Sequence, residues 1–122
     1  MLDTVKRTIS DYMMLETGEN VLVALSGGAD STALLLSLRE LGYPVRAFHL
    51  NHCLRGEESE RDQQFCTDFC RRYNIPLTVH RIWAQQEAKQ AGQSVETFSR
   101  QRRYQLLTAL AGQQGCYRAQ PQ

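Results

Sequence analysis

Several signals of common protein classes are missing from this chain of 122 residues. Its four cysteines form no Cys-x-x-Cys pair, which argues against a zinc ribbon or a redox-active dithiol. No apolar stretch is long enough to span a membrane, and the amphipathic N-terminus has acidic residues early, unlike a signal peptide. The sequence therefore predicts a protein of the reducing cytoplasm with no membrane partner, and its length fits one domain.

Two widespread nucleotide-binding motifs are also absent, because no lysine follows a Walker-type loop and no Gly-x-Gly-x-x-Gly occurs. The chain has instead Ser-Gly-Gly-Ala-Asp-Ser at residues 26–31, between the apolar run 21–25 and a leucine-rich segment, 32–41, with helical periodicity. A buried strand that turns directly into a helix leaves the first helical N–H groups unpaired at the positive end of the dipole. The pattern predicts an anion site, and phosphate is the expected anion.

The glycines, the serines and the aspartate of this hexapeptide each have a candidate role. Glycines at positions 27 and 28 allow a sharp turn and a close approach to phosphate, and the two serines can donate hydroxyl hydrogen bonds. A carboxylate here would repel phosphate unless a cation lay between them, so Asp30 is predicted to bind Mg²⁺ directly or through water. The alternative is an ordinary loop in which Asp30 only caps the helix. The predicted phosphate-binding residues are Ser26, Gly27, Gly28, Ala29, Asp30 and Ser31.

Strands and helices are predicted to alternate along the chain, which indicates a parallel sheet. The last residues, from Gly115 on, are too few and too polar to predict a fourth strand. We expect an α/β, Rossmann-like parallel sheet with helices on both faces, truncated after about three strands, and an open edge that would allow a homodimer. The expected helices are residues 2–17, 30–41, 60–73, 84–91 and 95–111, the last capped by Ser94; the expected strands are 20–25, 45–50 and 77–82.

Two further polar segments are candidates for ligand contacts. The first follows the second expected strand, where an α/β sheet meets its ligand, and could donate to a ring nitrogen, a ribose or a phosphate. Its candidates are His49, Asn51, His52 and Arg55, and the alternative is a polar surface loop. The second segment places three charged residues on one helix face, where the alternative is a surface ion pair of little energetic weight. These are Glu96, Arg100 and Arg103.

Charge and cysteine placement add two weaker expectations. Residues 1–60 carry a net charge of −4 and residues 61–122 a net charge of +5, so the second half could face a polyanion or could simply be a solvated helical surface. Cys66 and Cys70 are four residues apart beside phenylalanines, and we predict that they are small core residues.

The hexapeptide resembles the pyrophosphatase loop of the N-type ATP-pyrophosphatase, or PP-loop, superfamily, whose fold is of the adenine nucleotide alpha hydrolase type. The segment Asn-His-Cys-Leu-Arg-Gly-Glu-Glu-Ser at residues 51–59 is similar to the matching segment of the tRNA(Ile)-lysidine synthase family. Residues 94–104 are similar to a helix of the same family that carries Glu, then Arg, then Arg-Tyr. The resemblance spans about residues 19–115. It implies that residues 1–122 form a partial N-terminal PP-loop domain.

By this resemblance the parent enzyme is an ATP-dependent carbon–nitrogen ligase that uses Mg²⁺, adenylates the wobble cytidine of tRNA(Ile) and joins L-lysine to it. The implied catalytic residues are Asp30, Arg100 and Arg103, with His49 and Asn51 at ATP and His52, Arg55 and Glu96 at the second substrate. The family continues into Gly-His-x-x-x-Asp-x-x-Glu-Thr, so this fragment is expected to be inactive alone. The alternatives are a nucleotide-binding module without catalysis and another tRNA-modifying PP-loop enzyme.

Overall fold

The computed structural model describes residues 20–54 and 56–119, and the predicted N-terminal helix at residues 2–17 lies outside them. Within the described part, helices and strands follow the predicted order closely. None of these helices is long and apolar enough to cross a membrane. The elements are β1 (Val21–Leu25), α2 (Ala29–Glu40), β2 (Val45–Asn51), α3 (Glu57–Arg72), β3 (Leu77–Arg81), α4 (Ala84–Ala91), α5 (Val95–Gln114) and β4 (Tyr117–Ala119).

Three helix ends show why these boundaries fall where they do. Helix α3 begins three residues earlier than predicted, and its first turn holds three acidic residues, which suit the positive end of a helix dipole. Helix α5 begins after Ser94, whose Oγ accepts a hydrogen bond from the N–H of Thr97 at 3.2 Å, so the predicted cap is confirmed. The same helix ends at Gly115, whose φ of 65° is the left-handed conformation that glycine adopts easily.

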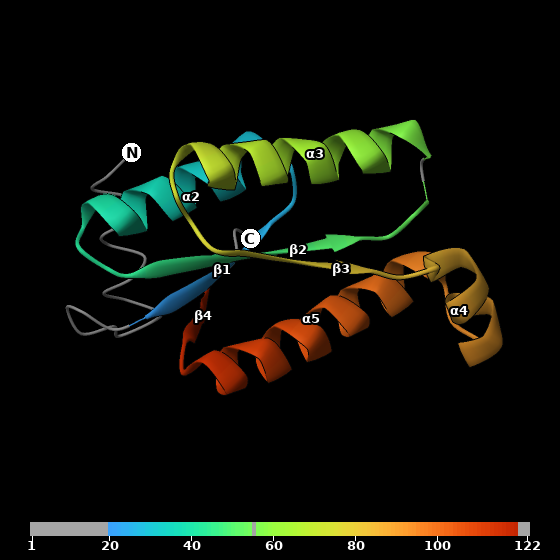
Figure 1. Cartoon of the computed structure of the whole chain (residues 1–122). Helices are drawn as coiled ribbons and strands as arrows, with labels where there is room; N and C mark the ends of the chain where they lie inside the picture. Colours follow the sequence, from blue (N-terminus) through green and yellow to red (C-terminus); the bar gives the residue numbers. More distant parts are fainter. Residues whose placement is uncertain (1–19, 55, 120–122) are drawn as a thin grey trace.

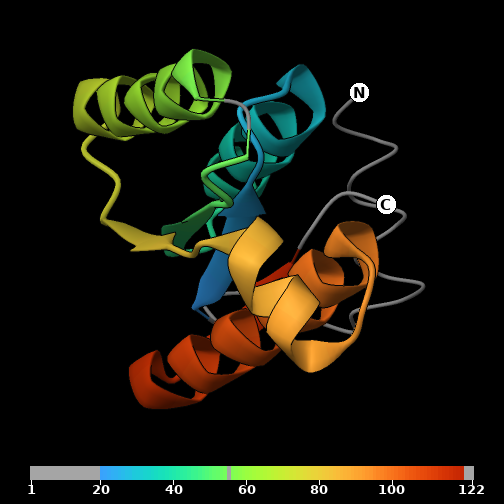
Figure 2. The ribbon, with the colours of Figure 1, turned by 90° about the vertical axis from the view of Figure 1, so that its right-hand side faces the viewer.

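The sheet is parallel, with strand order β3-β2-β1-β4. All five residues of β1 are buried, as expected of a central strand with neighbours on both sides. Alternate β1 side chains face opposite layers: Val21, Val23 and Leu25 pack against α2 and α3, whereas Leu22 and Ala24 pack against α5. Figures 1 and 2 show the two helical layers, with α2 and α3 on one face of the sheet and α4 and α5 on the other.

The expectation of only three strands was wrong. Residues 117–119 pair in parallel with β1, in the register Val21↔Tyr117 to Val23↔Ala119. The N–H of Tyr117 donates to the carbonyl of Asn20 at 2.8 Å, and Cys116 packs against the core beside α5. A short strand at the edge of a sheet can be held by main-chain hydrogen bonds without an apolar sequence. The hydropathy of residues 117–119 therefore did not reveal the strand. The open edge of β1, on which the predicted homodimer rested, is therefore occupied by β4.

This strand order creates a switch point at β1. The chain passes from β1 to β2 and β3 in one direction and then returns to place β4 on the opposite side of β1. In open α/β sheets, ligands bind in the crevice at the carboxyl ends of the strands where the connections change direction. The loop at residues 26–28 leaves β1 at that end of the sheet.

Candidate functional site

The loop between β1 and α2 has a conformation that glycine makes possible. Gly27 has φ of 86°, in the left-handed region, while Gly28 is the N-cap of α2 with an extended backbone. The Oγ of Ser31 donates to the carbonyl of Gly28 at 3.1 Å and accepts the N–H of Ser26 at 3.2 Å. The buried Ser31 therefore holds the loop closed, whereas the exposed Ser26 lies at the rim of a cavity.

The start of α2 presents main-chain donors. The N–H of Gly28 donates to the Oγ of Ser26 at 3.4 Å. Among residues 20–54 and 56–119, no hydrogen bond engages the N–H groups of Ala29, Asp30 and Ser31, the first three of the helix. The predicted cluster of unpaired N–H groups is thus present, backed by the dipole of a 12-residue helix. Such a cluster binds anions.

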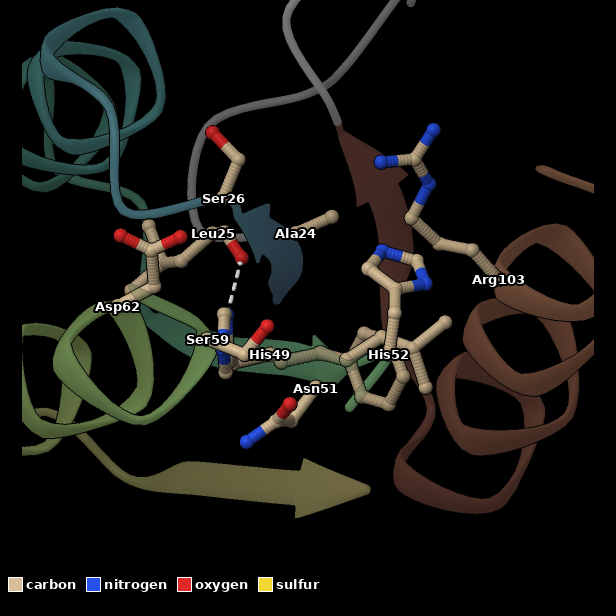
Figure 3. A pocket seen from close by; sticks show the side chains of 11 residues that line it. Ala24, Leu25, Ser26, His49, Asn51, His52, Ser59, Asp62 and Arg103 are labelled. Atoms are coloured by element: carbon tan, nitrogen blue, oxygen red, sulfur yellow. Dashed lines mark hydrogen bonds between the residues drawn. The ribbon is translucent and has the colours of Figure 1, made fainter. Parts of the chain in front are cut away.

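A cleft opens beside this loop and has two connected parts. The inner part lies at the carboxyl ends of β1 and β2, and the outer part, about 680 Å³, lies between α3 and α5. The close-up in Figure 3 shows Asp62 on the α3 side and Arg103 on the α5 side, with Ser26 between them at the loop. The residues that line both parts are Ser26, His52, Ser59, Asp62 and Arg103.

Asp62 is a site residue that sequence reasoning missed. A Cβ built on Gly27 would lie 3.0 Å from both Cγ and Oδ1 of Asp62, so this carboxylate packs directly against the loop. No ion pair or hydrogen bond engages it within the described residues. On the sequence Asp62 is one of many charged positions on the polar face of α3, and only the packing of α3 beside the loop distinguishes it.

The spacing of the three charged residues of α5 predicted that they share one helix face, and all three line the outer cleft. Glu96 and Arg100 form an ion pair of 3.1 Å with side chains 86% and 69% exposed, so the pair is worth at most about 1 kcal/mol. Arg103 has no carboxylate partner within the described residues and extends to both parts of the cleft. Arg103 is therefore free to contact an anionic or acceptor-rich ligand.

His49 and Asn51 were predicted to contact ATP, and the structure shows them engaged inside the protein. The Nδ1 of the buried His49 donates to the carbonyl of Leu25 at 2.8 Å, because a carbonyl can only accept, and this fastens the end of β1 below the loop (Figure 3). Asn51 accepts the N–H of Cys53 at 2.9 Å and donates to Gln63 at 2.8 Å. Their contact with ATP stays a prediction, and these bonds favour a supporting role.

The remaining predicted residues divide between the cleft and its surroundings. His52 lines both parts of the cleft, while Asp30 is exposed and lines neither of them. Arg55 lies outside the described residues. Across 20–54 and 56–119, no three His, Cys, Asp or Glu side chains gather in a way that could hold a metal ion alone.

Two pKa shifts describe the layer behind the cleft. The hydrogen bond and charge of Arg81 lower the pKa of Glu60, whose Oε1 lies 2.7 Å from an Arg81 nitrogen, and this pair joins α3 to β3. Burial raises the pKa of Cys66 from 9.0 to about 12 and that of Cys70 to about 11. Both thiols are buried in the core between α3 and the sheet, so the prediction that they are core residues is confirmed.

Comparison with known proteins gives the context for this geometry. The sequence matches the PP-loop domain family over residues 1–118. It is 35% identical over 114 residues to the tRNA(Ile)-lysidine synthase of Clostridium tetani and 44% identical over 113 residues to that of Porphyromonas gingivalis, covering 90% of this chain and 24% of each relative. The chain thus spans about a quarter of the length of these relatives.

A solved structure shares the fold. The NH3-dependent NAD synthetase from Campylobacter jejuni superposes with a TM-score of 0.65 and 18% identity, covering 96% of this chain and 51% of that chain. The fold and the loop define a parallel α/β domain with a glycine-rich turn and unpaired helical N–H groups at its switch point. The chain belongs to the PP-loop domain family, as the hexapeptide indicated.

Proposed function

We propose that this chain is the ATP-binding part of a tRNA(Ile)-lysidine synthase, a carbon–nitrogen ligase. The observation that carries the proposal is the row of unpaired N–H groups at the start of α2, in a loop whose Ser26 lines a cleft with Arg103 on its far wall. The similarity to relatives of that name supports the same activity. The tRNA, L-lysine and the cytoplasmic location belong to the proposal as well.

The site residues have distinct proposed roles. The N–H groups of residues 29–31 bind the β and γ phosphates of ATP, and charge that develops on the leaving pyrophosphate is stabilised there without rearrangement. Arg103, with Arg100 beside it, contacts the α phosphate or the cytosine. Mg²⁺ fits this cleft because it commonly takes only one or two carboxylates and completes its shell with phosphate oxygens and water. Asp30 stays a predicted Mg²⁺ contact.

The proposed reaction has two balanced steps. The O2 oxygen of the wobble cytosine attacks the α phosphorus, the bond from that phosphorus to the bridging oxygen breaks, and pyrophosphate leaves. The amine of L-lysine then attacks C2 of the activated base, the C2–O bond breaks, AMP leaves and the nitrogen loses a proton. Both steps involve the tRNA base, and we propose that the described cleft holds the ATP for the first of them; this chain spans 24% of the length of the Clostridium tetani relative.

Titration of the 122-residue chain with ATP tests the proposal. We expect weak, saturable ATP binding that competes with pyrophosphate, and no lysidine when tRNA, lysine and ATP are supplied together. In an enzyme of full family length that carries this domain, Asp30→Ala is expected to abolish pyrophosphate release while leaving the circular dichroism spectrum unchanged. Absence of any ATP binding by the chain would contradict the proposal. Wild-type pyrophosphate release by the Asp30→Ala variant would contradict the role of Asp30.

A further inference from the structure

The carboxylate of Asp62 lies in an unusual electrostatic position. Its Cγ and Oδ1 are 3.0 Å from the position of a Cβ on Gly27, so a negative charge adjoins a loop suited to anions. No arginine, lysine or histidine pairs with it within the described residues. A phosphate on the loop would therefore face an uncompensated carboxylate at close range, and like charges at such distances repel.

We propose that Asp62 binds the divalent cation that accompanies the triphosphate, directly or through a water molecule. This inference rests on the proposed function, because it assumes that a nucleotide phosphate occupies the loop. The cation would lie between the Asp62 carboxylate and the phosphate oxygens and would turn the repulsion into an attraction. Asp62 would thereby make nucleotide binding depend on the metal.

The chemistry of the cleft suits Mg²⁺ or Mn²⁺ better than zinc. No group of three His, Cys, Asp or Glu side chains could form a cage within the described part of the chain, whereas a structural zinc site needs about four such ligands. Mg²⁺ keeps several waters and is usually bound by one or two carboxylates together with substrate phosphates. One carboxylate beside an anion-binding loop meets that requirement.

Asp62 is better placed for this contact than Asp30. Asp62 lines both parts of the cleft, on the wall opposite Arg103, as Figure 3 shows. Asp30 is exposed at the second position of α2 and lines neither part. A cation held at Asp62 would be inside the cleft, which Arg103 and Ser26 of the loop also line.

A second, independent observation indicates that this cleft is built to hold a ligand. Ser99 lies on α5 at the outer part of the cleft, four residues before Arg103. The residue is only 8% exposed, and its Oγ is buried with no hydrogen-bond partner within the described residues. A buried hydroxyl without a partner is uncommon in proteins, and a rotation of this side chain toward the cleft would let a ligand supply one.

The test compares ATP affinity with and without Mg²⁺ for three single substitutions in the 122-residue chain, each removing one negative charge. These are Asp62→Asn, Asp30→Asn and, as the control, Asp68→Asn. Asp68 is on the same helix, about 9 Å further along it, and accepts a hydrogen bond from Gln64 that an asparagine can also accept. The control therefore reports the effect of net charge alone.

We expect Mg²⁺ to tighten ATP binding by the wild type and the Asp68→Asn variant roughly tenfold or more, a readily measured difference. For Asp62→Asn we expect Mg²⁺ to tighten ATP binding only about twofold or less. Metal-free ATP should bind at least as tightly as to the wild type, because the repulsion between the Asp62 carboxylate and the phosphates is gone. Water-proton relaxation by Mn²⁺ should show less cation in the ternary complex of that variant. Asp30→Asn, at the other predicted Mg²⁺ contact, should lower the metal dependence less than Asp62→Asn does.

The outcomes separate this inference from the proposed function. If the wild type binds no ATP, the proposed function is wrong. If ATP binds and Asp62→Asn keeps the full Mg²⁺ dependence, or if only Asp30→Asn loses it, the inference about Asp62 is wrong and the proposed function stands. Should Asp62→Asn fail to fold by circular dichroism, Asp62→Ser is measured in its place under the same criteria.

Discussion

The substitution Gly27→Ala tests the geometry on which the site depends. Gly27 has φ of 86°, and a left-handed conformation costs a residue with a Cβ about 1–2 kcal/mol. The new Cβ would also lie 3.0 Å from Cγ and 3.1 Å from Cβ of Asp62, so turning the carboxylate away is insufficient and α3 must shift. Overpacking of this kind costs about 1–3 kcal/mol, and we take the lower end, because Asp62 is exposed. The expected loss is about 2–3 kcal/mol.

A matched control separates the two contributions to this loss. Gly42 has φ of 95°, and a Cβ there would meet nothing within 4 Å. Gly42→Ala should therefore cost only the conformational part, about 1–2 kcal/mol. Urea denaturation followed by circular dichroism gives the free energy of unfolding for each variant. ATP titration should show weaker binding for Gly27→Ala and unchanged binding for Gly42→Ala, since only the former alters the loop.

Two results would refute this reasoning. Equal destabilisation by Gly27→Ala and Gly42→Ala would mean that α3 does not pack closely against the loop. No destabilisation by either would mean that the positive φ angles are wrong. The double variant Gly27→Ala with Asp62→Ala adds a check, because it removes the contact with Cγ but keeps the one with the Asp62 Cβ. Partial recovery of stability relative to Gly27→Ala is expected.

Two further predictions concern other parts of the fold. Ser94→Ala should lower the free energy of unfolding by about 1 kcal/mol, because the N–H of Thr97 loses its acceptor at 3.2 Å. Ser94→Asp should retain most of the wild-type stability, because its carboxylate can accept the same hydrogen bond. An unchanged urea midpoint for the alanine variant would contradict the cap. Cys66 and Cys70, with pKa values raised by burial to about 12 and 11, should resist alkylation at pH 8 in the folded protein and react in urea. Because each thiol ionises more readily when unfolded, at its ordinary value of 9.0, their contribution to stability is full below pH 9 and is lost as pH rises toward 12. Rapid native alkylation would show that they are not buried.

Much of the local structure could be predicted because its causes lie within a few residues. Glycines at 27 and 28 after five apolar residues predicted a strand, a turn and a helix, and the structure has them at Val21–Leu25 and Ala29–Glu40. Ser94 predicted a cap three residues before the N–H that it accepts. The spacing of residues 96, 100 and 103 placed them on one helix face, and all three line the cleft.

Other features depend on contacts between residues that are distant in the chain. Sequence hydropathy gave no sign of β4, because an edge strand of three residues is held by main-chain bonds to β1. His49 and Asn51 had donor and acceptor groups at the right end of a strand, but the direction in which those groups point was set by the Leu25 carbonyl and by Gln63 on α3. The sequence specifies which donor and acceptor groups a side chain carries, whereas the tertiary packing determines which residue each group bonds.

The amino-acid sequence by itself determined the glycine turn and its unpaired N–H groups, since Gly27 adopts the positive φ easily and the first N–H groups of a helix have no partner within it. Only the tertiary structure decided which charges face that turn. Asp62 and Arg103 are 41 positions apart and belong to different helices. They lie on opposite walls of one cleft because α3 and α5 pack on opposite faces of the same sheet.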